Sequence, residues 1–292
     1  MTLKLTLDAF SGRPNPSVDL TPQEAADLVA RLGPVTAAPA AGAAIAQSPR
    51  LGYRGIVVEQ TGQVSANLPQ RFRLAGNQVI GSTGVLKTVD PAIEQSLLGN
   101  TALLARAGLP PAVASELVAQ SAAHAPAAAP STSTTPGPVV CRCAPLYEPA
   151  WWSDLASGGP RQINNNCYNY ACDIRTDTFA QPGHAANAMY TAETCLALRL
   201  AAKADMLTEI KLTTIACPPE GHLIALVIWP NVDFHFFRMN RDGLWSHKPG
   251  GMPVTNLDNS NKLIPDPRAA DRGPYVNFCE FMIVMHGHVK IK

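Results

Sequence analysis

The sequence predicts an α+β protein built of two domains joined by a linker. Three observations predict this: the 292 residues exceed a typical single domain of about 150, all seven cysteines follow residue 140, and the strand patterns of the second half follow one another without helical crossovers. Residues 121–140 consist mainly of Ala, Pro, Ser and Thr, which bury too little surface to fold alone. We therefore expect a small α+β accessory domain at 1–120, a linker at 121–140 and a second domain at 141–292.

The accessory domain carries strand and helix patterns but no recognisable chemistry. The expected elements are a strand at 3–10, a helix from the capping box Thr21-Pro22-Gln23-Glu24 to about Leu32, strands at 53–60 and 71–80, and mostly helical chain from 91 to about 120. The phrase Phe-Ser-Gly-Arg-Pro-Asn-Pro at 10–16 predicts a specific turn, which packing explains as well as binding does. The partner of this domain stays unknown.

Charge and hydropathy exclude several classes of partner. The formal net charge is +1 with 15% charged residues, so the chain lacks the basic excess of a nucleic-acid-binding protein. The longest apolar run is Leu223–Trp229, far short of the roughly 20 residues of a membrane helix. The N-terminus reads as a strand rather than a secretory signal. We expect a cytoplasmic protein with free thiols, or one exported by a non-classical route, that binds neither nucleic acid nor membrane.

The second domain is expected to place helices before a run of antiparallel strands. The elements are a short helix from about Cys167, a longer helix near 192–205, and strands at 222–229, 233–239, 244–248 and 278–286. Three asparagines precede Cys167 and favour an N-cap, which puts the cysteine in the first turn of its helix. Helix N–H groups lower a thiol's pKa there, so Cys167 is a candidate nucleophile. The alternative is a small buried apolar side chain.

Two histidines compete for the role of a general base that would activate Cys167. His222 opens a buried strand, and His235 lies inside a strand between phenylalanines. Because an imidazole buried among aromatic rings needs a polar partner, we prefer His235.

The turn that follows the strand of His235 predicts a polar partner for this histidine. Asn240-Arg-Asp-Gly243 suits a type I turn followed by a glycine in the left-handed conformation. The resulting three-residue loop sets Phe237 opposite His247, which places His247 on the same face as His235. His247 is then a candidate orienter of the base, with a surface histidine as the alternative.

Two stretches of the second domain resemble the papain-like cysteine amidohydrolases of the NlpC/P60 and CHAP types. These are Cys-Tyr-Asn-Tyr-Ala at 167–171 and the run from Glu-Gly-His at 220–222 to Trp-Ser-His-Lys at 245–248. The resemblance implies a helix packed on an antiparallel sheet, with Cys167 as nucleophile, His235 as base and His247 as orienter. The pair that usually reads Gly-Asp is Gly-His at 221–222, which keeps His222 as an alternative base.

Secondary candidates surround this triad. Gln162 and Asn166 precede the cysteine, and the resemblance implies that Gln162 donates to an oxyanion. Asn256 and Asp258 are reserve candidates for the orienter. Cys141 and Cys143 lack the second ligand pair of a zinc site and are either a redox pair or free thiols.

The expected activity is cleavage of an amide bond through a Cys167 thioester, with neither metal nor organic cofactor. The resemblance implies a bacterial hydrolase with a peptide or peptidoglycan-like substrate. Two alternatives remain: a non-catalytic binding module on a papain-like fold, and a thiol-dependent acyltransferase.

Overall fold

The structure, a computed structural model, describes residues 2–35, 49–62, 65–81, 84–122, 139–152 and 160–292. The chain divides into two compact units. Unit 1 comprises Met1–Ala9, Asn15–Ala46 and Tyr53–Ala127, and unit 2 comprises Phe10–Pro14, Gln47–Gly52 and Ala128–Lys292. Most of the linker expected at 121–140 lies outside the described residues. The prediction did not foresee that Phe10–Pro14, from the unusual phrase at 10–16, packs within unit 2.

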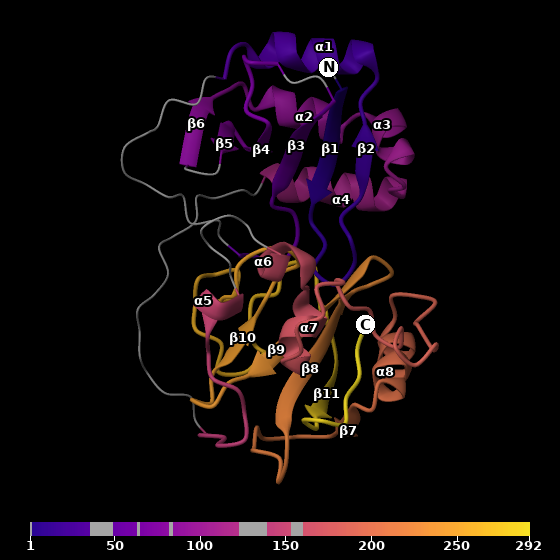
Figure 1. The fold of residues 1–292 in the computed structure, drawn as a ribbon, viewed down its shortest axis with the longest axis vertical. Coiled ribbons are helices and arrows are strands. Elements are labelled where there is room, and N and C mark those ends of the chain that lie inside the picture. Colours follow the sequence, from indigo (N-terminus) through magenta and orange to yellow (C-terminus); the bar gives the residue numbers. More distant parts are fainter. Residues whose placement is uncertain (1, 36–48, 63–64, 82–83, 123–138, 153–159) are drawn as a thin grey trace. The chain divides into compact units, whose positions relative to one another are not determined.

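Unit 1 is built on a six-stranded antiparallel sheet in the order β2-β1-β3-β4-β5-β6 (Figure 1). Its strands are β1 (Thr2–Asp8), β2 (Ser17–Asp19), β3 (Gly55–Thr61), β4 (Arg71–Ala75), β5 (Gln78–Gly81) and β6 (Gly84–Thr88). Leu3, Leu5 and Leu7 are buried and alternate with more exposed neighbours, as the sequence predicts. The single strand expected at 71–80 is instead a hairpin, because Gly76 turns the chain with a φ of 60°.

In the described part of unit 1, four helices accompany this sheet (Figure 1). They are α1 (Pro22–Leu32), α2 (Ala92–Leu98), α3 (Thr101–Arg106) and α4 (Pro111–Ala122). The predicted capping box is confirmed, since Thr21 accepts from the Glu24 N–H and the Glu24 carboxylate accepts from the Thr21 N–H. Helix α1 contacts β1, and α3 contacts β2.

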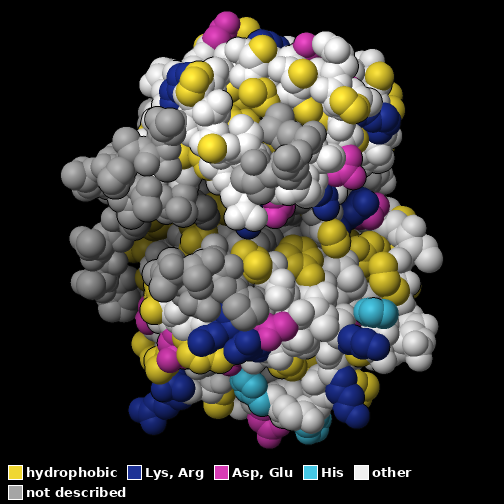
Figure 2. Space-filling model, turned by 45° about the horizontal axis from the view of Figure 1, so that its top comes forward, with side chains coloured by type: hydrophobic (Ala, Val, Ile, Leu, Met, Phe, Trp, Pro, Cys, Tyr) yellow, Lys and Arg dark blue, Asp and Glu magenta, His cyan; other side chains and the backbone are white. Residues whose placement is uncertain are grey.

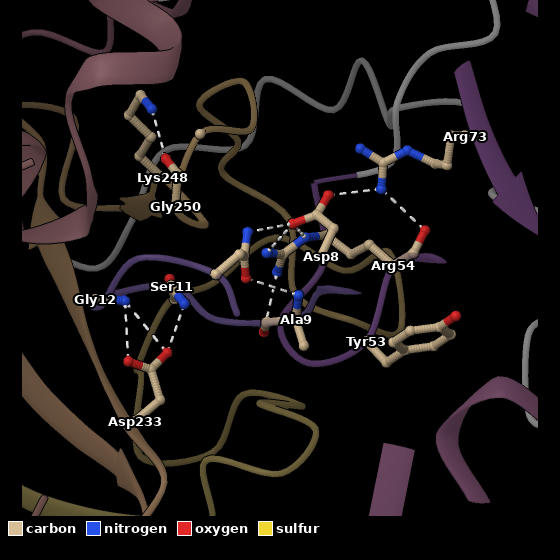
Figure 3. A network of polar contacts seen from close by, with 12 residues as sticks. Asp8, Ala9, Ser11, Gly12, Tyr53, Arg54, Arg73, Asp233, Lys248 and Gly250 are labelled. Carbon is tan, nitrogen blue, oxygen red and sulfur yellow. Dashed lines mark hydrogen bonds and ion pairs between the residues drawn. The ribbon is translucent and has the colours of Figure 1, made fainter. Parts of the chain in front are cut away.

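A buried carboxylate closes one end of β1 (Figure 3). Asp8 forms ion pairs of 2.6 Å with both Arg54 and Arg73. Burial alone would raise the pKa of Asp8, but the two guanidinium groups hold it well below its usual range. This network belongs wholly to unit 1 and is structural.

Unit 2 contains a five-stranded antiparallel sheet in the order β10-β9-β8-β11-β7. Its strands are β7 (Thr208–Ile210), β8 (His222–Trp229), β9 (Asp233–Met239), β10 (Trp245–His247) and β11 (Asn277–Val284). The bounds expected for β8 and β9 are confirmed, whereas β7 was not predicted. The expected hairpin register is also confirmed: Phe237 pairs with His247, and Gly243 has a φ of 82°. The α+β class with antiparallel sheets is therefore correct.

Short helices cover unit 2. They are α5 (Pro149–Trp152), α6 (Pro160–Asn164), α7 (Cys167–Cys172) and α8 (Cys195–Ala204). Helix α7 packs on β9 and β10, and α8 packs on β8 and β11. Tyr168 of α7 and Leu198 of α8 share one hydrophobic core with Phe234 and Phe236. This core fixes α7, and therefore Cys167, against the central strands.

Two disulfides correct the expectation of free thiols. Cys141 pairs with Cys217, and Cys195 pairs with Cys279, which leaves Cys143, Cys167 and Cys172 as thiols. Of the two alternatives for Cys141 and Cys143, the redox pair is wrong, because Cys141 is bonded to a cysteine 76 residues along the chain; Cys143 is an exposed free thiol. Both bridges close long loops of unit 2, where they limit the conformational freedom of the unfolded chain.

Charged side chains of both signs are interspersed on the face drawn in Figure 2, in keeping with a net charge of +1. Among the described residues, no helix combines the length and apolar character that crossing a membrane requires.

Candidate functional site

The segment Phe10–Pro14, which we call segment 10–14, docks against the start of β9. Asp233, the first residue of β9, accepts hydrogen bonds from the N–H groups of Ser11 (2.5 Å) and Gly12 (3.2 Å) (Figure 3). It also accepts one from the N–H group of Arg13 (3.0 Å). The hydroxyl of Tyr275 donates to the same carboxylate at 2.5 Å. These donors satisfy a carboxylate that is wholly buried.

A chain of hydrogen bonds continues from Ser11 through two buried imidazoles. The carbonyl of Leu257 can only accept, so His247 donates its Nε2–H at 2.9 Å. With both rings neutral, His247 Nδ1 then accepts from His235 Nε2–H at 3.0 Å, and His235 Nδ1 accepts from the Ser11 hydroxyl at 2.5 Å. The structure thus brings His235 and His247 together. The other ring nitrogen of His235, Nδ1, is hydrogen-bonded to Ser11.

Burial shifts the pKa of two members of this cluster, His247 and Asp233. It lowers the pKa of His247 to about 4, against the opposing effects of the Leu257 carbonyl and Asp258. It raises the pKa of Asp233 to about 6, although the Ser11 N–H and the Tyr275 hydroxyl act in the opposite direction.

Cys167 is the first residue of α7, as predicted, but its surroundings do not suit a nucleophile. The side chain is fully buried in the core with Phe234 and Phe236, and Sγ lies 4.0 Å from the Phe234 carbonyl oxygen. Burial raises the pKa of the Cys167 thiol well above its usual range, and the charge of Asp233 adds to this effect. The expected lowering by the helix N-terminus is outweighed by desolvation.

Asn166 and Gln162 act as structural links. Asn166 is the N-cap of α7, and its Nδ2 donates to the carbonyls of Gly12 (2.7 Å) and Ala180 (2.8 Å). Gln162 Nε2 donates to the Gly251 carbonyl at 3.2 Å, so this amide holds a loop rather than an oxyanion.

Lys248 lies next to this loop and is fully buried. Its ammonium donates to the carbonyl of Gly250 at 2.6 Å (Figure 3). It also donates to the carbonyls of Gln162 and Asn165 (2.5 Å for Asn165). It thereby fastens the end of β10 to the chain around α6.

The alternative base His222 and the reserve orienter Asp258 contact other parts of unit 2. His222 Nε2 donates to the Ala171 carbonyl at 2.8 Å, and its Nδ1 lies 3.2 Å from His286 Nε2. Burial lowers the pKa of His222 to about 3. Asp258 accepts from the N–H groups of Ser260 and Lys262 in its own loop. His247, rather than Asn256 or Asp258, makes the contact with His235.

Ser11 and Tyr275 are members of the cluster that sequence reasoning missed. Ser11 is separated from His235 by 224 positions. The dense turn phrase at 10–16 was its only signal. Asp233 begins the strand expected at 233–239, but no role was assigned to it. Within the described ranges, no group of three or more His, Cys, Asp and Glu residues has the arrangement of a metal site.

Comparison with known proteins finds a relative of part of the chain. No family model matches the chain, and no solved structure matches it. The chain is similar to insoluble matrix shell protein 1 of Ruditapes philippinarum, with 43% identity over 138 residues. The alignment covers 47% of this chain and 87% of the shell protein.

This likeness overturns the predicted activity. The relative is named for a shell matrix and not for a reaction, and it supports neither a cysteine peptidase or amidohydrolase nor a bacterial origin. The predicted peptide or peptidoglycan-like substrate has no support either. The acyltransferase alternative requires the same Cys167 nucleophile. The buried thiol with its raised pKa supplies the physical reason for both corrections.

The cytoplasmic location is also wrong. Two disulfides form and persist in oxidising compartments, and the relative belongs by name to a shell matrix. The prediction of a cytoplasmic location rested on the strand-like pattern of the first residues, and that pattern does not determine the compartment. With 43% identity across 87% of the shell protein, this chain belongs to the family of insoluble matrix shell protein 1.

Proposed function

We propose that this protein is a non-catalytic structural component of a matrix, and that unit 2 is its binding module. The observation that carries the proposal is the position of Ser11. Its hydroxyl donates a hydrogen bond to Nδ1 of His235 at 2.5 Å, and both residues are buried. The groups that would form a reactive centre are used instead to hold a segment of the chain. The name of the relative supports the matrix role.

The papain-like architecture of unit 2 belongs to the same proposal. It is supported by Cys167 at the start of α7, by the packing of α7 on β9, and by the adjacency of His235 and His247. A module of this kind would keep the helix and the sheet while the histidines serve as structural links.

Thiol labelling tests the non-catalytic role. We expect iodoacetamide at pH 6 to modify exposed Cys143 and to leave buried Cys167 unmodified in the native chain. The Cys167→Ala variant should associate into sedimenting material to the same extent as the unsubstituted chain. Labelling of Cys167 faster than Cys143, or peptide cleavage that is lost in Cys167→Ala, would contradict the proposal.

A further inference from the structure

Segment 10–14 is held in unit 2 chiefly through its main chain. Three successive N–H groups, from Ser11, Gly12 and Arg13, converge on the carboxylate of Asp233 at 2.5 to 3.3 Å. Hydrogen bonds to a charged acceptor are stronger than those between neutral groups. Because they involve the backbone of a short stretch, any chain carrying this stretch can form them.

The carbonyl side of the segment is recognised as well. The Gly12 oxygen accepts from Asn166 Nδ2 at 2.7 Å and from Gln181 Nε2 at 2.8 Å. Asn166 also caps α7, so the same side chain orders the helix and receives the segment. The receiving groups are therefore positioned by unit 2 itself.

Side-chain features make the site selective for the sequence Ser-Gly-Arg. A Cβ on Gly12 would lie 2.4 Å from the ring of Phe234, so this position accepts only glycine without rearrangement. The Ser11 hydroxyl donates to His235, and Arg13 donates at 2.8 Å to Glu193. Proline at position 13 would remove the third N–H group.

We infer that these residues form a recognition site for segment 10–14 that a second copy of this chain can occupy. The inference rests on the proposed function and names its partner: another molecule of the same chain, bound through its Ser11-Gly12-Arg13. Exchange of the segment between copies would link molecules without a covalent bond or a cofactor.

A synthetic peptide of residues 9–16 tests the site in the full chain. The Gly12→Val chain should lose its own segment from the site, because the added side chain collides with Phe234. We expect it to bind the fluorescein-labelled peptide saturably, as measured by anisotropy. The unsubstituted chain, whose site is filled, and the Gly12→Val/Asp233→Asn chain should bind at least about tenfold more weakly. A labelled peptide carrying Gly12→Val is the matched control and should not bind.

Mixing two variants tests the second copy as partner. The Gly12→Val chain keeps an intact site with a defective segment, and the Asp233→Asn chain keeps an intact segment with a defective site. We expect an equimolar mixture to sediment as a larger species than either variant alone. Excess peptide of residues 9–16 should return it to the sizes of the separate chains.

The outcomes separate this inference from the proposed function. Far-UV circular dichroism checks the fold of each variant, and Ser11→Ala/Arg13→Ala replaces Gly12→Val if that chain fails to fold. If neither the Gly12→Val nor the Ser11→Ala/Arg13→Ala chain binds the peptide, or if binding does not depend on Asp233, the inferred recognition site does not exist. If the peptide binds but the mixture does not associate, a second copy of the chain is not the partner. The thiol labelling of Cys167 bears on neither result.

Discussion

His235 and His247 lie edge to face, with ring centroids 4.9 Å apart and planes inclined by 84°. In this arrangement each Nε2–H points at an acceptor, since His235 donates to His247 and His247 donates to the Leu257 carbonyl. A proton added to His247 Nδ1 would set two donors against each other. The hydrogen bond between the two rings therefore requires a neutral His247.

Acid should weaken unit 2 through His247. The pKa of this residue falls from 6.5 to about 4 on folding, so its contribution is complete above pH 6.5 and is lost as pH falls toward 4. At about 1.4 kcal/mol per pKa unit, this shift contributes at most about 3 kcal/mol to the free energy of unfolding. Urea unfolding followed by tryptophan fluorescence reports unit 2 alone, because all four tryptophans lie in it. The His247→Gln variant should lose less stability between pH 7 and 4.5, whereas exposed His288→Gln should behave like the unsubstituted chain.

Asp233 should act in the opposite sense. Because burial raises its pKa from 3.8 to about 6, its ionisation opposes folding: stability is greatest below pH 3.8 and falls as pH rises through 6. The Asp233→Asn variant should therefore lose more stability on acidification than the unsubstituted chain, because Asp233 no longer offsets the effects of His247 and His222. The same urea titrations measure it, with exposed Glu220→Gln as control. An unchanged pH profile would mean that Asp233 keeps its ordinary pKa.

Thiol counting should separate three classes of cysteine. In the native chain we expect rapid modification of Cys143 alone, because Cys167 and Cys172 are buried. In denaturant without reductant three thiols should react, and after reduction all seven. Mass spectrometry of the alkylated chain gives the count. Five or more reactive thiols before reduction would rule out one of the two disulfides.

Removing one bridge should cost much of the stability of unit 2. Cys195 and Cys279 close a loop of 84 positions, for which loop-closure entropy predicts about 4.5 kcal/mol. We expect Cys195→Ser/Cys279→Ser to lower the free energy of unfolding by about 2–5 kcal/mol in urea. The Cys143→Ser variant, which alters an exposed thiol, should stay within about 0.5 kcal/mol.

Lys248 offers a test of the buried carbonyl contacts. Lys248→Met keeps a similar length but leaves the carbonyls of Gln162, Asn165 and Gly250 without their ammonium donor. Stranded buried acceptors cost about 1–3 kcal/mol each before relaxation, so we expect a loss of about 2–4 kcal/mol. Lys211→Met, at an exposed position, is the matched control. Equal midpoints for the two variants in urea would refute this account.

The sequence predicted local features of the site better than its long-range contacts. The meeting of His235 and His247 followed from one turn, because the glycine at 243 selects the loop length that sets the register. The helix start at Cys167 followed from the N-cap asparagine. The contact of Ser11 with His235 depends on chain segments 224 positions apart, and no local pattern encodes such a pairing.

The misjudged chemistry of Cys167 has the same origin. A helix N-terminus is a local feature that lowers a thiol's pKa, whereas burial is a property of the whole fold and raises it more. The disulfides were missed because the first ten residues were taken to indicate a reducing compartment, in which free thiols are expected. The sequence does not show that the paired cysteines lie close together in space.

The borders of the sheet in unit 2 bear on how such a protein aggregates. Strands β7 and β10 form its two margins, and each is three residues long. Margins so short present few amides to a neighbouring molecule and template additional strands poorly. Concentrated preparations should therefore give amorphous precipitates that leave thioflavin T dark, and not amyloid-like fibrils.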